Sequence, residues 1–528
     1  MSASADTLAR PAAEPSARRA RRRPSGEVLA YVLLVAVALA VRLVALGDRA
    51  FHHDESQDAY FSWIFFTRGD YEYNPLLHGP LRFYLTAGMY GLFGVSDFTA
   101  RLAPALMGTA MVPLPYLLRH QLGRVAAFAA AVLLAVGPSY LFFSRFARED
   151  IYIACLTLAL LVVVFRFLDR PRPHQPAVIG ALLALSFATK ESTFITVFVA
   201  GTFFLAVLAW RRELILGPVR AVGLEAWGWA VAAFVGVFTV LFTTFLTHPG
   251  GLWDGIYRGL DYWLGQQDVR RGGNPWYFYV VTLVAHEWPA LLLGAIGAVV
   301  AFRRPTLLRV FLVWAFALSL AVYSWAGERF EWLVLHPLLP LLLLAGVGVQ
   351  AIWDARRQWY GMVGAVAAAI AFAYVGFASW SLSAAHPGDP REFLVSAQTS
   401  PEVARIADRL VAAAERAERA GRPYRITVDA ADGATYPWAW YFRDLDVNYQ
   451  DLGRLGSPPP SDALILTQGA HDRLTPTLPD YTARRFPFRI WWVPDYGRAS
   501  LGDWARWFTD RRPWNPTGGM PAWLYLRR

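Results

Sequence analysis

Long apolar runs separated by short polar segments fill most of the chain as far as residue 383. A helix needs roughly 20 apolar residues to cross the hydrocarbon core of a bilayer, and several of the runs are shorter. The candidate spans are residues 28–46, 99–118, 125–143, 151–168, 176–190, 192–210, 226–247, 278–301, 310–325, 332–352 and 360–382. The pattern predicts a mainly α-helical, polytopic membrane domain over residues 28–383, with about eleven transmembrane helices.

The composition is that of a membrane protein. Of the 528 residues, 55% are hydrophobic and only 17% are charged, which is too apolar for a soluble enzyme of this length. The net charge of +10 does not indicate nucleic-acid binding, because the basic residues form short clusters between the apolar runs. Residues 1–27 contain an arginine cluster and little apolar surface, so we expect a disordered cytoplasmic tail. The run that follows is long enough to span and lacks a clear cleavage site, which favours a retained first helix over a signal peptide.

Charged residues are divided between the two ends of the predicted helices. With the tail inside the cell, alternation of the spans brings arginine pairs to the inner loops, as the positive-inside rule requires. These pairs are Arg119 and Arg124, Arg170 and Arg172, Arg211 and Arg212, Arg303 and Arg304, and Arg356 and Arg357. Acidic residues collect in the outer loops. An odd number of spans in the plasma membrane places everything after Ser383 on the extracytoplasmic side.

Residues 384–528 are expected to form a small extracytoplasmic α/β domain. An Ala/Arg/Glu-rich stretch that ends near Ala420 has a helical pattern, and the segments 424–428 and 463–466 have the composition of strands. Four tryptophans lie between residues 491 and 507. They either meet lipid headgroups or form part of the core of this domain.

The first outer loop, residues 47–98, opens with the polar segment Phe51-His-His-Asp-Glu-Ser-Gln-Asp58. Three carboxylates and two imidazoles directly after a membrane helix indicate a site. The alternative is a solvated loop start with a helix N-cap at Asp54 or Ser56. The stretches 60–67 and 76–93 are aromatic and amphipathic but too short to span. We expect them to be helices that lie in the plane of the membrane interface.

This loop resembles that of the GT-C membrane glycosyltransferases. The resemblance rests on an Asp-Glu pair after the first membrane helix, on interfacial helices and on the segment His78-Gly-Pro-Leu81. It is greatest for the branch that contains the protein O-mannosyltransferases (glycosyltransferase 39) and the aminoarabinose transferases. Together with the opening His-His-Asp-Glu-Ser, the segment Tyr323-Ser-Trp-Ala-Gly-Glu-Arg329 resembles an uncharacterised prokaryotic subgroup. The resemblance covers roughly residues 28–345 and leaves out the outer domain.

The resemblance implies a sugar transfer from a polyprenyl-phosphate carrier to an acceptor on the extracytoplasmic side. Asp54 matches the catalytic carboxylate of the family, and Glu55 stands beside it. The chemistry supports this match independently, because an acceptor hydroxyl or amine that attacks an anomeric carbon needs a carboxylate to take its proton. The phosphate leaving group needs cations.

The second outer loop, Ser144-Arg-Phe-Ala-Arg-Glu-Asp150, lies where the family has another acidic motif. We expect Arg148 to face the phosphate, Glu149 to hold the acceptor or the sugar, and Asp150 to orient a substrate as part of the catalytic set. The alternative is an ordinary salt-bridged turn, because two basic and two acidic residues within this segment can neutralise one another.

Lys190 is the only lysine of the chain, in which every other residue of the Lys+Arg total of 50 is arginine. An ammonium is a compact point charge on a flexible stem, whereas the guanidinium of arginine is a planar fork. Its presence in Ala188-Thr-Lys-Glu191, where the family has a similar Thr-Lys motif, suggests a partner that needs this geometry, such as the carrier phosphate. The alternative is a structural ion pair with Glu191 or another loop carboxylate.

Three further residues complete the predicted substrate site. His78 and Arg82 of the first outer loop and Arg329 of a late outer loop are candidates for binding the donor lipid or its phosphate. A metal held by outer-loop histidines such as His248, His286 and His336 is an alternative, but no metal-ligand spacing is present. We therefore expect no cofactor and no catalytic metal.

The sequence as a whole favours an inverting glycosyltransferase that uses a polyprenyl-phosphate sugar and a glycan, lipid or protein acceptor. A flippase or transporter component for lipid-linked sugars is one alternative, although it should carry polar residues along its spans rather than at their outer ends. A noncatalytic scaffold of a glycan assembly complex is another.

The arginine alternation predicts the topology. A periplasm-active reporter fused after Arg528 should be active, whereas the same reporter inserted near Arg212 should be inactive. A cytoplasm-active reporter at the two positions serves as the control and should give the opposite result. A cytoplasmic C-terminus would contradict the predicted outer domain.

Overall fold

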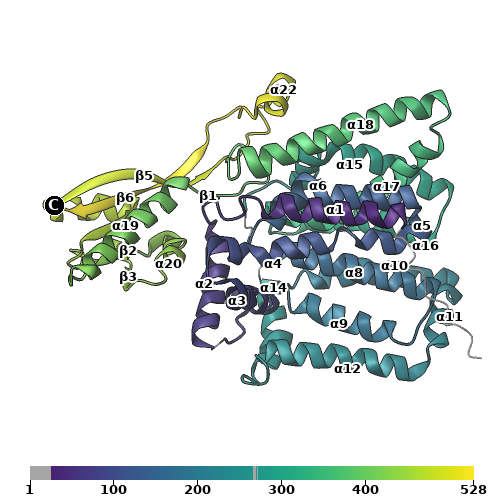
Figure 1. Ribbon diagram of the computed structural model, residues 1–528, viewed down its shortest axis with the longest axis horizontal. Helices are drawn as coiled ribbons and strands as arrows, with labels where there is room; N and C mark the ends of the chain where they lie inside the picture. Colours follow the sequence, from purple (N-terminus) through teal and green to yellow (C-terminus); the bar gives the residue numbers. More distant parts are fainter. Residues whose placement is uncertain (1–24, 70, 266–268, 270–271) are drawn as a thin grey trace, which may run out of the picture.

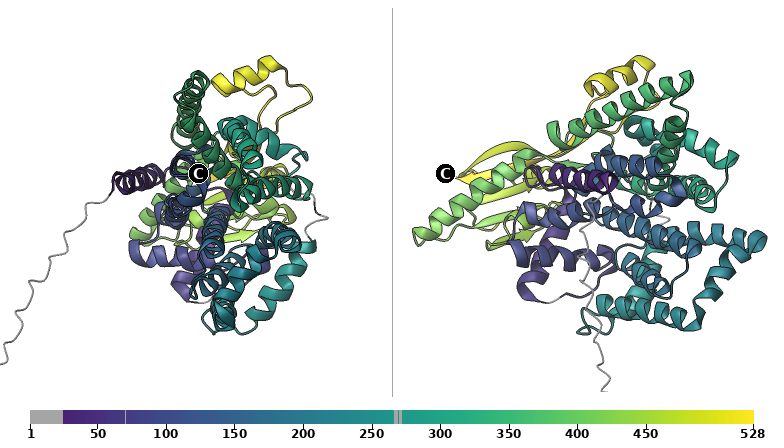
Figure 2. Two further views of the ribbon diagram at one scale, coloured as in Figure 1. Left: turned by 90° about the vertical axis from the view of Figure 1, so that its right-hand side faces the viewer. Right: turned by 45° about the vertical axis from the view of Figure 1, so that its right-hand side comes forward.

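The computed structural model of the protein describes residues 25–69, 71–265, 269 and 272–528. Long helices run roughly parallel to one another in a bundle, and a domain that contains a β-sheet projects from one end of it (Figure 1). The right-hand view of Figure 2 shows the same arrangement. The predicted mainly α fold with a small C-terminal α/β domain is confirmed. Residues 1–24 of the predicted tail lie outside the described residues.

Each of the eleven apolar runs forms a helix or a pair of helices. In chain order these are α1 (Gly26–Leu43), α4 (Asp97–Ala110), α6 (Arg124–Val136) with α7 (Pro138–Ser144), α8 (Asp150–Asp169), α9 (Gln175–Phe187), α10 (Thr193–Arg211), α12 (Gly223–Phe242), α15 (Phe278–Arg303), α16 (Leu307–Trp325), α17 (Leu335–Asp354) and α18 (Trp359–Trp380).

Eight of these helices, α17 together with the turn before it, are long and apolar enough to cross a membrane, and the pair α6–α7, bent by 51°, would make a ninth. The other two are shorter. In α4 the helix gives way to a 3₁₀ turn because Pro113 and Pro115 lack the N–H groups that would continue it. Helix α9 has 13 residues and lies between α8 and α12 (Figure 1). The exact number of spans therefore stays a prediction.

Two helices of the first outer loop close one end of the bundle. Helix α2 (His53–Arg68) runs across the direction of the long helices, as the interfacial prediction requires, and is followed by α3 (Leu81–Phe93) (Figure 1). The N-terminus of α2 is capped by His52, whose Nδ1 accepts from the backbone N–H of Asp54 at 3.1 Å. The Glu55 carboxylate accepts in return from the N–H of His52. The polar segment thus both starts a helix and presents carboxylates at its first turn.

The C-terminal domain is a six-stranded sheet in the order β1-β5-β6-β4-β2-β3. Strands β2, β3 and β4 are parallel, whereas β5 and β6 form a long antiparallel pair. The predicted strands are confirmed as β2 and β4, and the predicted helix as α19. The elements are β1 (Gln398–Thr399), α19 (Pro401–Arg419), β2 (Ile426–Asp429), α20 (Trp438–Tyr441), β3 (Val447–Gln450), β4 (Ala463–Thr467), α21 (Gln468–Leu474), β5 (Tyr481–Trp491), α22 (Leu501–Asp510) and β6 (Gly518–Arg527).

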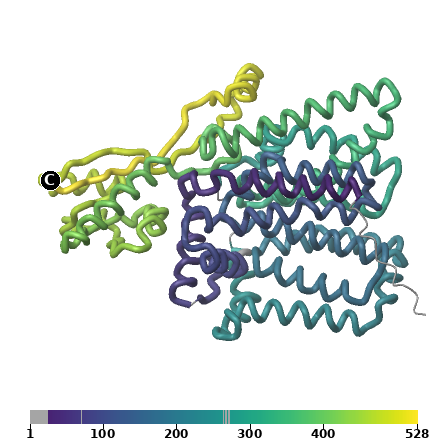
Figure 3. Tube along the Cα trace, in the orientation of Figure 1, coloured from purple at the N-terminus to yellow at the C-terminus, as the bar shows by residue number. Residues whose placement is uncertain are grey.

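Aromatic contacts fix this domain against the bundle. The segment between β5 and β6, which includes α22, returns to the outer end of α18 (Figures 1 and 3). There Trp492 and Trp507 are buried with Phe393 and with Ala285 of α15. These two tryptophans are therefore packing residues, which decides between the two alternatives that the sequence left open for them. On the other side, the indole of Trp440 donates to Asp97 at 2.9 Å, so the domain is also held above the first outer loop.

Candidate functional site

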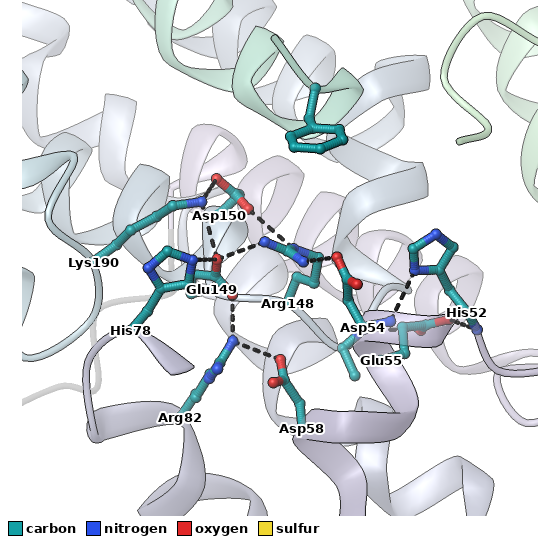
Figure 4. Close-up of polar contacts among 12 residues, drawn as sticks. His52, Asp54, Glu55, Asp58, His78, Arg82, Arg148, Glu149, Asp150 and Lys190 are labelled. Atoms are coloured by element: carbon teal, nitrogen blue, oxygen red, sulfur yellow. Dashed lines mark hydrogen bonds and ion pairs between the residues drawn. The ribbon is translucent and has the colours of Figure 1, made fainter. Parts of the chain in front are cut away.

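Charged residues from three outer segments meet at the end of the bundle where α2 lies (Figure 4). Helix α2 and the loop after it supply one side, the start of α8 supplies the centre, and the turn after α9 supplies the other side. The cluster comprises Asp54, Asp58, His78, Arg82, Arg148, Glu149, Asp150, Lys190 and Glu191, with Glu55 behind it. Of the predicted site residues, only Arg329 is not among them.

Asp54 is the most exposed carboxylate in the cluster, with 27% of its side chain accessible to solvent. Its Oδ2 accepts a hydrogen bond from Nη1 of Arg148. Burial disfavours the charged form, but Arg148 and His52 outweigh this effect and hold the pKa of Asp54 below its usual range. Asp54 is thus an ionised carboxylate that a molecule from outside can reach.

Glu55 points away from this opening and is fully buried. Its carboxylate accepts from Arg101 at 2.8 and 3.1 Å and from Arg49 at 3.0 Å, and also from the backbone N–H of Ala147. Burial opposes ionisation, but Arg101 and Arg49 lower the pKa of Glu55 to about 2. With its oxygens occupied, this carboxylate anchors α2 to α4 and to the second outer loop. This burial favours a positioning role for Glu55 over its predicted place in the catalytic set.

Glu149 is the most heavily paired acid, and it is fully buried. Arg82 contacts one of its oxygens at 2.5 Å, while Arg148 and Lys190 contact the other at 2.9 and 3.0 Å. The guanidinium of Arg148 also lies 4.0 Å from the centre of the Trp332 ring, which is a cation–π contact. These cations offset the cost of removing the carboxylate from water. They also hold the second outer loop in place.

Lys190 bridges the two adjacent acids, with its Nζ 2.8 Å from Asp150 and 3.0 Å from Glu149. Burial disfavours the ammonium, but Asp150 and Glu149 outweigh this effect and raise the pKa of Lys190. An ammonium has three donors, so one remains after these two contacts. If Lys190 forms a structural ion pair, its partners are Asp150 and Glu149 rather than Glu191. Its third donor remains available to a phosphate oxygen.

Backbone pairing explains why the His78-Gly79 segment lies beside Lys190. The N–H of Gly79 donates to the carbonyl of Thr189, and that of Leu81 donates to the carbonyl of Ala188. A Cβ atom on Gly79 would lie 2.2 Å from the Ala188 carbonyl oxygen, so only glycine allows this approach. The pairing brings Nδ1 of His78 to 2.7 Å from Glu191. Burial lowers the pKa of the ring, but Glu191 and Glu149 outweigh it and raise the pKa of His78.

Arg82 connects α3 to both neighbouring segments, because Nη1 contacts Asp58 at 2.6 Å as well as Glu149. Of the two acids that Arg82 contacts, Glu149 carries the negative charge. Burial raises the pKa of Asp58 to about 8, although Arg82 opposes the rise. A proton on Asp58 therefore relieves part of the excess negative charge at neutral pH.

The remaining candidates lie apart from the cluster or at its edge. Arg329 donates to the backbone carbonyls of Ser324 and Asn274 at 3.0 Å and so braces two outer loops. His336 lies 3.8 Å from Asp150, whereas His286 faces Glu392 at the same distance in a separate place. Within the part of the chain that the structure describes, no group of three or more His, Cys, Asp or Glu side chains is arranged to hold a metal ion.

An apolar cavity of about 110 Å³ lies among the long helices, and its lining includes His336, which is 3.8 Å from Asp150. It runs along α8 from Phe165 to Ala154 and is closed on the other sides by α10, α16 and α17. His336 and Tyr323 line its polar end, and their rings stack with centroids 4.8 Å apart. No local pattern in the sequence indicates this cavity, because its lining comes from four helices whose residues are typical of a membrane core.

Comparison with known proteins shows which proteins share this fold. Residues 77–241, which include Glu149, Asp150 and Lys190, match the family model of the dolichyl-phosphate-mannose-protein mannosyltransferases. No curated protein matches the chain.

Solved structures with the same fold include ArnT from Cupriavidus metallidurans. Its apo form is 18% identical with a TM-score of 0.59 over 86% of this chain and 96% of that one. Its form bound to undecaprenyl phosphate is 17% identical with a TM-score of 0.59 over 93% and 97%.

The oligosaccharyltransferase of Archaeoglobus fulgidus is 13% identical with a TM-score of 0.54 over 81% of this chain and 64% of that one. The arabinofuranosyltransferase AftD from Mycobacteria is 13% identical with a TM-score of 0.51 over 94% and 40%. The chain has the fold of the GT-C membrane glycosyltransferases, which confirms the resemblance seen in the sequence.

The burial of Glu55 predicts a large effect on stability. Glu55→Gln removes the counter-charge of Arg101 and Arg49 and should destabilise the protein by about 3–5 kcal/mol, as the loss of one partner of a buried ion pair does. Thermal denaturation of the purified protein measures the effect. Glu402→Gln, which removes an exposed ion pair with Arg484, is the control and should cost about 0–1 kcal/mol. Equal melting temperatures for the two variants would contradict the anchoring role.

Proposed function

We propose that the protein transfers a sugar from a polyprenyl-phosphate donor to an acceptor on the extracytoplasmic face of the plasma membrane. The observation that carries this proposal is the position of Asp54. An accessible, ionised carboxylate lies beside Arg148, in a cluster whose Asp150 is 3.8 Å from His336, a lining residue of the apolar cavity. A lipid-linked substrate needs this combination of an apolar path and a charged end.

The donor fits between the cavity and the cations. The polyprenyl chain lies against the apolar lining along α8, and the phosphate meets the third donor of Lys190 and the Nε of Arg148, which is buried without a hydrogen-bond partner. The contact of ArnT with undecaprenyl phosphate supports this placement, because that protein shares the fold over nearly its whole length. Glu149, Asp150 and Arg82 hold the two cations in position.

The reaction is a single displacement. The acceptor hydroxyl or amine attacks the anomeric carbon while its proton passes to the carboxylate of Asp54. The bond between that carbon and the phosphate oxygen breaks, and the electron pair leaves with the polyprenyl phosphate. Lys190 and Arg148 stabilise the charge that develops on this oxygen. One displacement inverts the configuration of the sugar.

The remaining predicted residues take supporting roles in this proposal. His78 and Glu191 fix the turn that carries Lys190, and Glu55 fixes the first turn of α2. Arg329 braces the outer loops near the donor rather than binding the phosphate. A flippase or a noncatalytic scaffold would have no use for an accessible, ionised carboxylate in this charged cluster, which is why we favour the enzyme.

Replacement of the base should abolish most of the turnover. Asp54→Asn keeps the size of the side chain but cannot take a proton, so turnover should fall by about a hundredfold or more, while expression and donor binding persist. Release of polyprenyl phosphate per folded molecule is the measurement. Asp451→Asn, in a surface ion pair with Arg454, is the control and should retain full activity. Near-normal turnover of Asp54→Asn would exclude Asp54 as the base.

Two substitutions of Lys190 separate its two possible roles. If the ammonium binds the phosphate, Lys190→Arg should weaken donor binding because the planar fork misplaces the charge, and Lys190→Met should weaken it further. If Lys190 serves only Asp150 and Glu149, arginine should be tolerated, and methionine should lower the melting temperature without changing donor affinity. Donor affinity and melting temperature are measured on the same samples, with Arg454→Met as the control. Unchanged donor affinity in Lys190→Met would exclude the phosphate role.

A further inference from the structure

Arg489 of strand β5 connects the outer domain to the first turn of α2. Its Nη2 donates to Nδ1 of His53 at 2.9 Å and to the carbonyl of Gly433 at 2.7 Å. His53 directly precedes Asp54. Burial lowers the pKa of Arg489, although the nearby carboxylates of Asp54 and Asp432 oppose this effect. Burial and Arg489 both lower the pKa of His53, so its ring is neutral and accepts this hydrogen bond.

The same arginine lines a groove of about 470 Å³ in the outer domain. The groove lies where the ladder between β5 and β6 is interrupted. Pro487 faces Pro521 in register, and neither has an N–H for the ladder, so the register shifts between Pro487 and Arg489. Beyond this shift Gly519 pairs with Ile490 and Gly518 with Trp491, and a Cβ atom on Gly518 would lie 2.6 Å from the indole nitrogen of Trp491. The absence of side chains at these two positions keeps this end of the groove open.

The charge of the groove is positive. Arg485 and Arg489 both line it, and among the described residues neither forms an ion pair with a carboxylate. The Nε of Arg489 is buried and has no hydrogen-bond partner. The neighbouring Arg484 differs, because it pairs with Glu402 of α19 and does not line the groove. Two guanidinium groups that no described carboxylate contacts directly are suited to bind a carboxylate or a phosphate.

We propose that this groove binds an anionic group of the acceptor, a carboxylate or a phosphate, and so selects negatively charged acceptors. The inference rests on the proposed function, because it assigns the groove to the acceptor of that reaction. Arg489 connects the groove to α2, because it lines the groove and its Nη2 contacts His53. An acceptor held by Arg485 and Arg489 therefore presents its nucleophile on the side where Asp54 is accessible.

Binding of three small probes to the purified full-length protein tests this inference. Methyl glucuronide carries a carboxylate, glucose 6-phosphate carries a phosphate, and methyl glucoside is neutral. Isothermal titration should give an affinity for at least one anionic probe about tenfold or more above that for methyl glucoside, and the stronger of the two identifies the anion. Arg485→Gln should remove about tenfold of that affinity, the usual effect of losing one charged hydrogen bond.

Arg484→Gln is the matched control, because it removes the same charge from the adjacent position of the same strand. It should bind the anionic probes as the unchanged protein does, and the melting temperatures of both variants should match that of the unchanged protein. Equal affinity for all three probes, or equal losses in Arg484→Gln and Arg485→Gln, would overturn the inference. Release of polyprenyl phosphate from the donor is a separate readout. Its absence would refute the proposed function even if the anionic probes bind.

Discussion

The burial of Glu149 among three cations is the constraint on which this end of the helix bundle depends. A carboxylate without exposure to solvent is costly unless cations surround it, and here Arg82, Arg148 and Lys190 come from three different segments. Each cation then carries a second contact: Arg82 to Asp58, Arg148 to Asp54, and Lys190 to Asp150. One buried charge thus fixes the start of α8, the first turns of α2 and α3, and the turn after α9 relative to one another.

The cluster contains more acids than permanently charged bases, and this imbalance bears on how a phosphate could bind. Protons carry part of the excess, because burial raises the pKa of Asp58 and Glu191 with Glu149 raises that of His78. A phosphate would therefore use the donors that the internal carboxylates leave unused. The site would bind the donor through the geometry of Lys190 and Arg148 rather than through a general surplus of positive charge. The sole lysine of the chain then has a physical reason to remain a lysine.

Much of the fold, and part of the site, could be predicted from the sequence. Apolar runs locate helices well because a bilayer demands them, and the acidic pairs at 54–55 and 149–150 stand out against that background. The role of Glu55 could not be predicted, since it depends on arginines 6 and 46 residues away that approach it only in the fold. Helix α4 is shorter than the predicted run 99–118, because two prolines end a helix without making an apolar run less hydrophobic.

Residues that reach the site from a distant segment could not be predicted from the sequence around them. Trp332 packs against Arg148, His336 lies beside Asp150, and Arg489 reaches His53 from a domain that begins hundreds of residues later. Each is an ordinary residue in its own stretch of sequence. Only the contacts between the outer domain, the late loops and α2 give these side chains a place at the site.

The central claim is that the accessible carboxylate and the buried cations act together on a lipid-linked sugar. Incubation of the purified protein with a panel of polyprenyl-phosphate sugars, in the presence and absence of acceptor, tests this claim most directly. Release of polyprenyl phosphate from at least one member of the panel, greatly reduced in Asp54→Asn, is the predicted result. No release from any member by a folded protein that still binds polyprenyl phosphate would contradict the account.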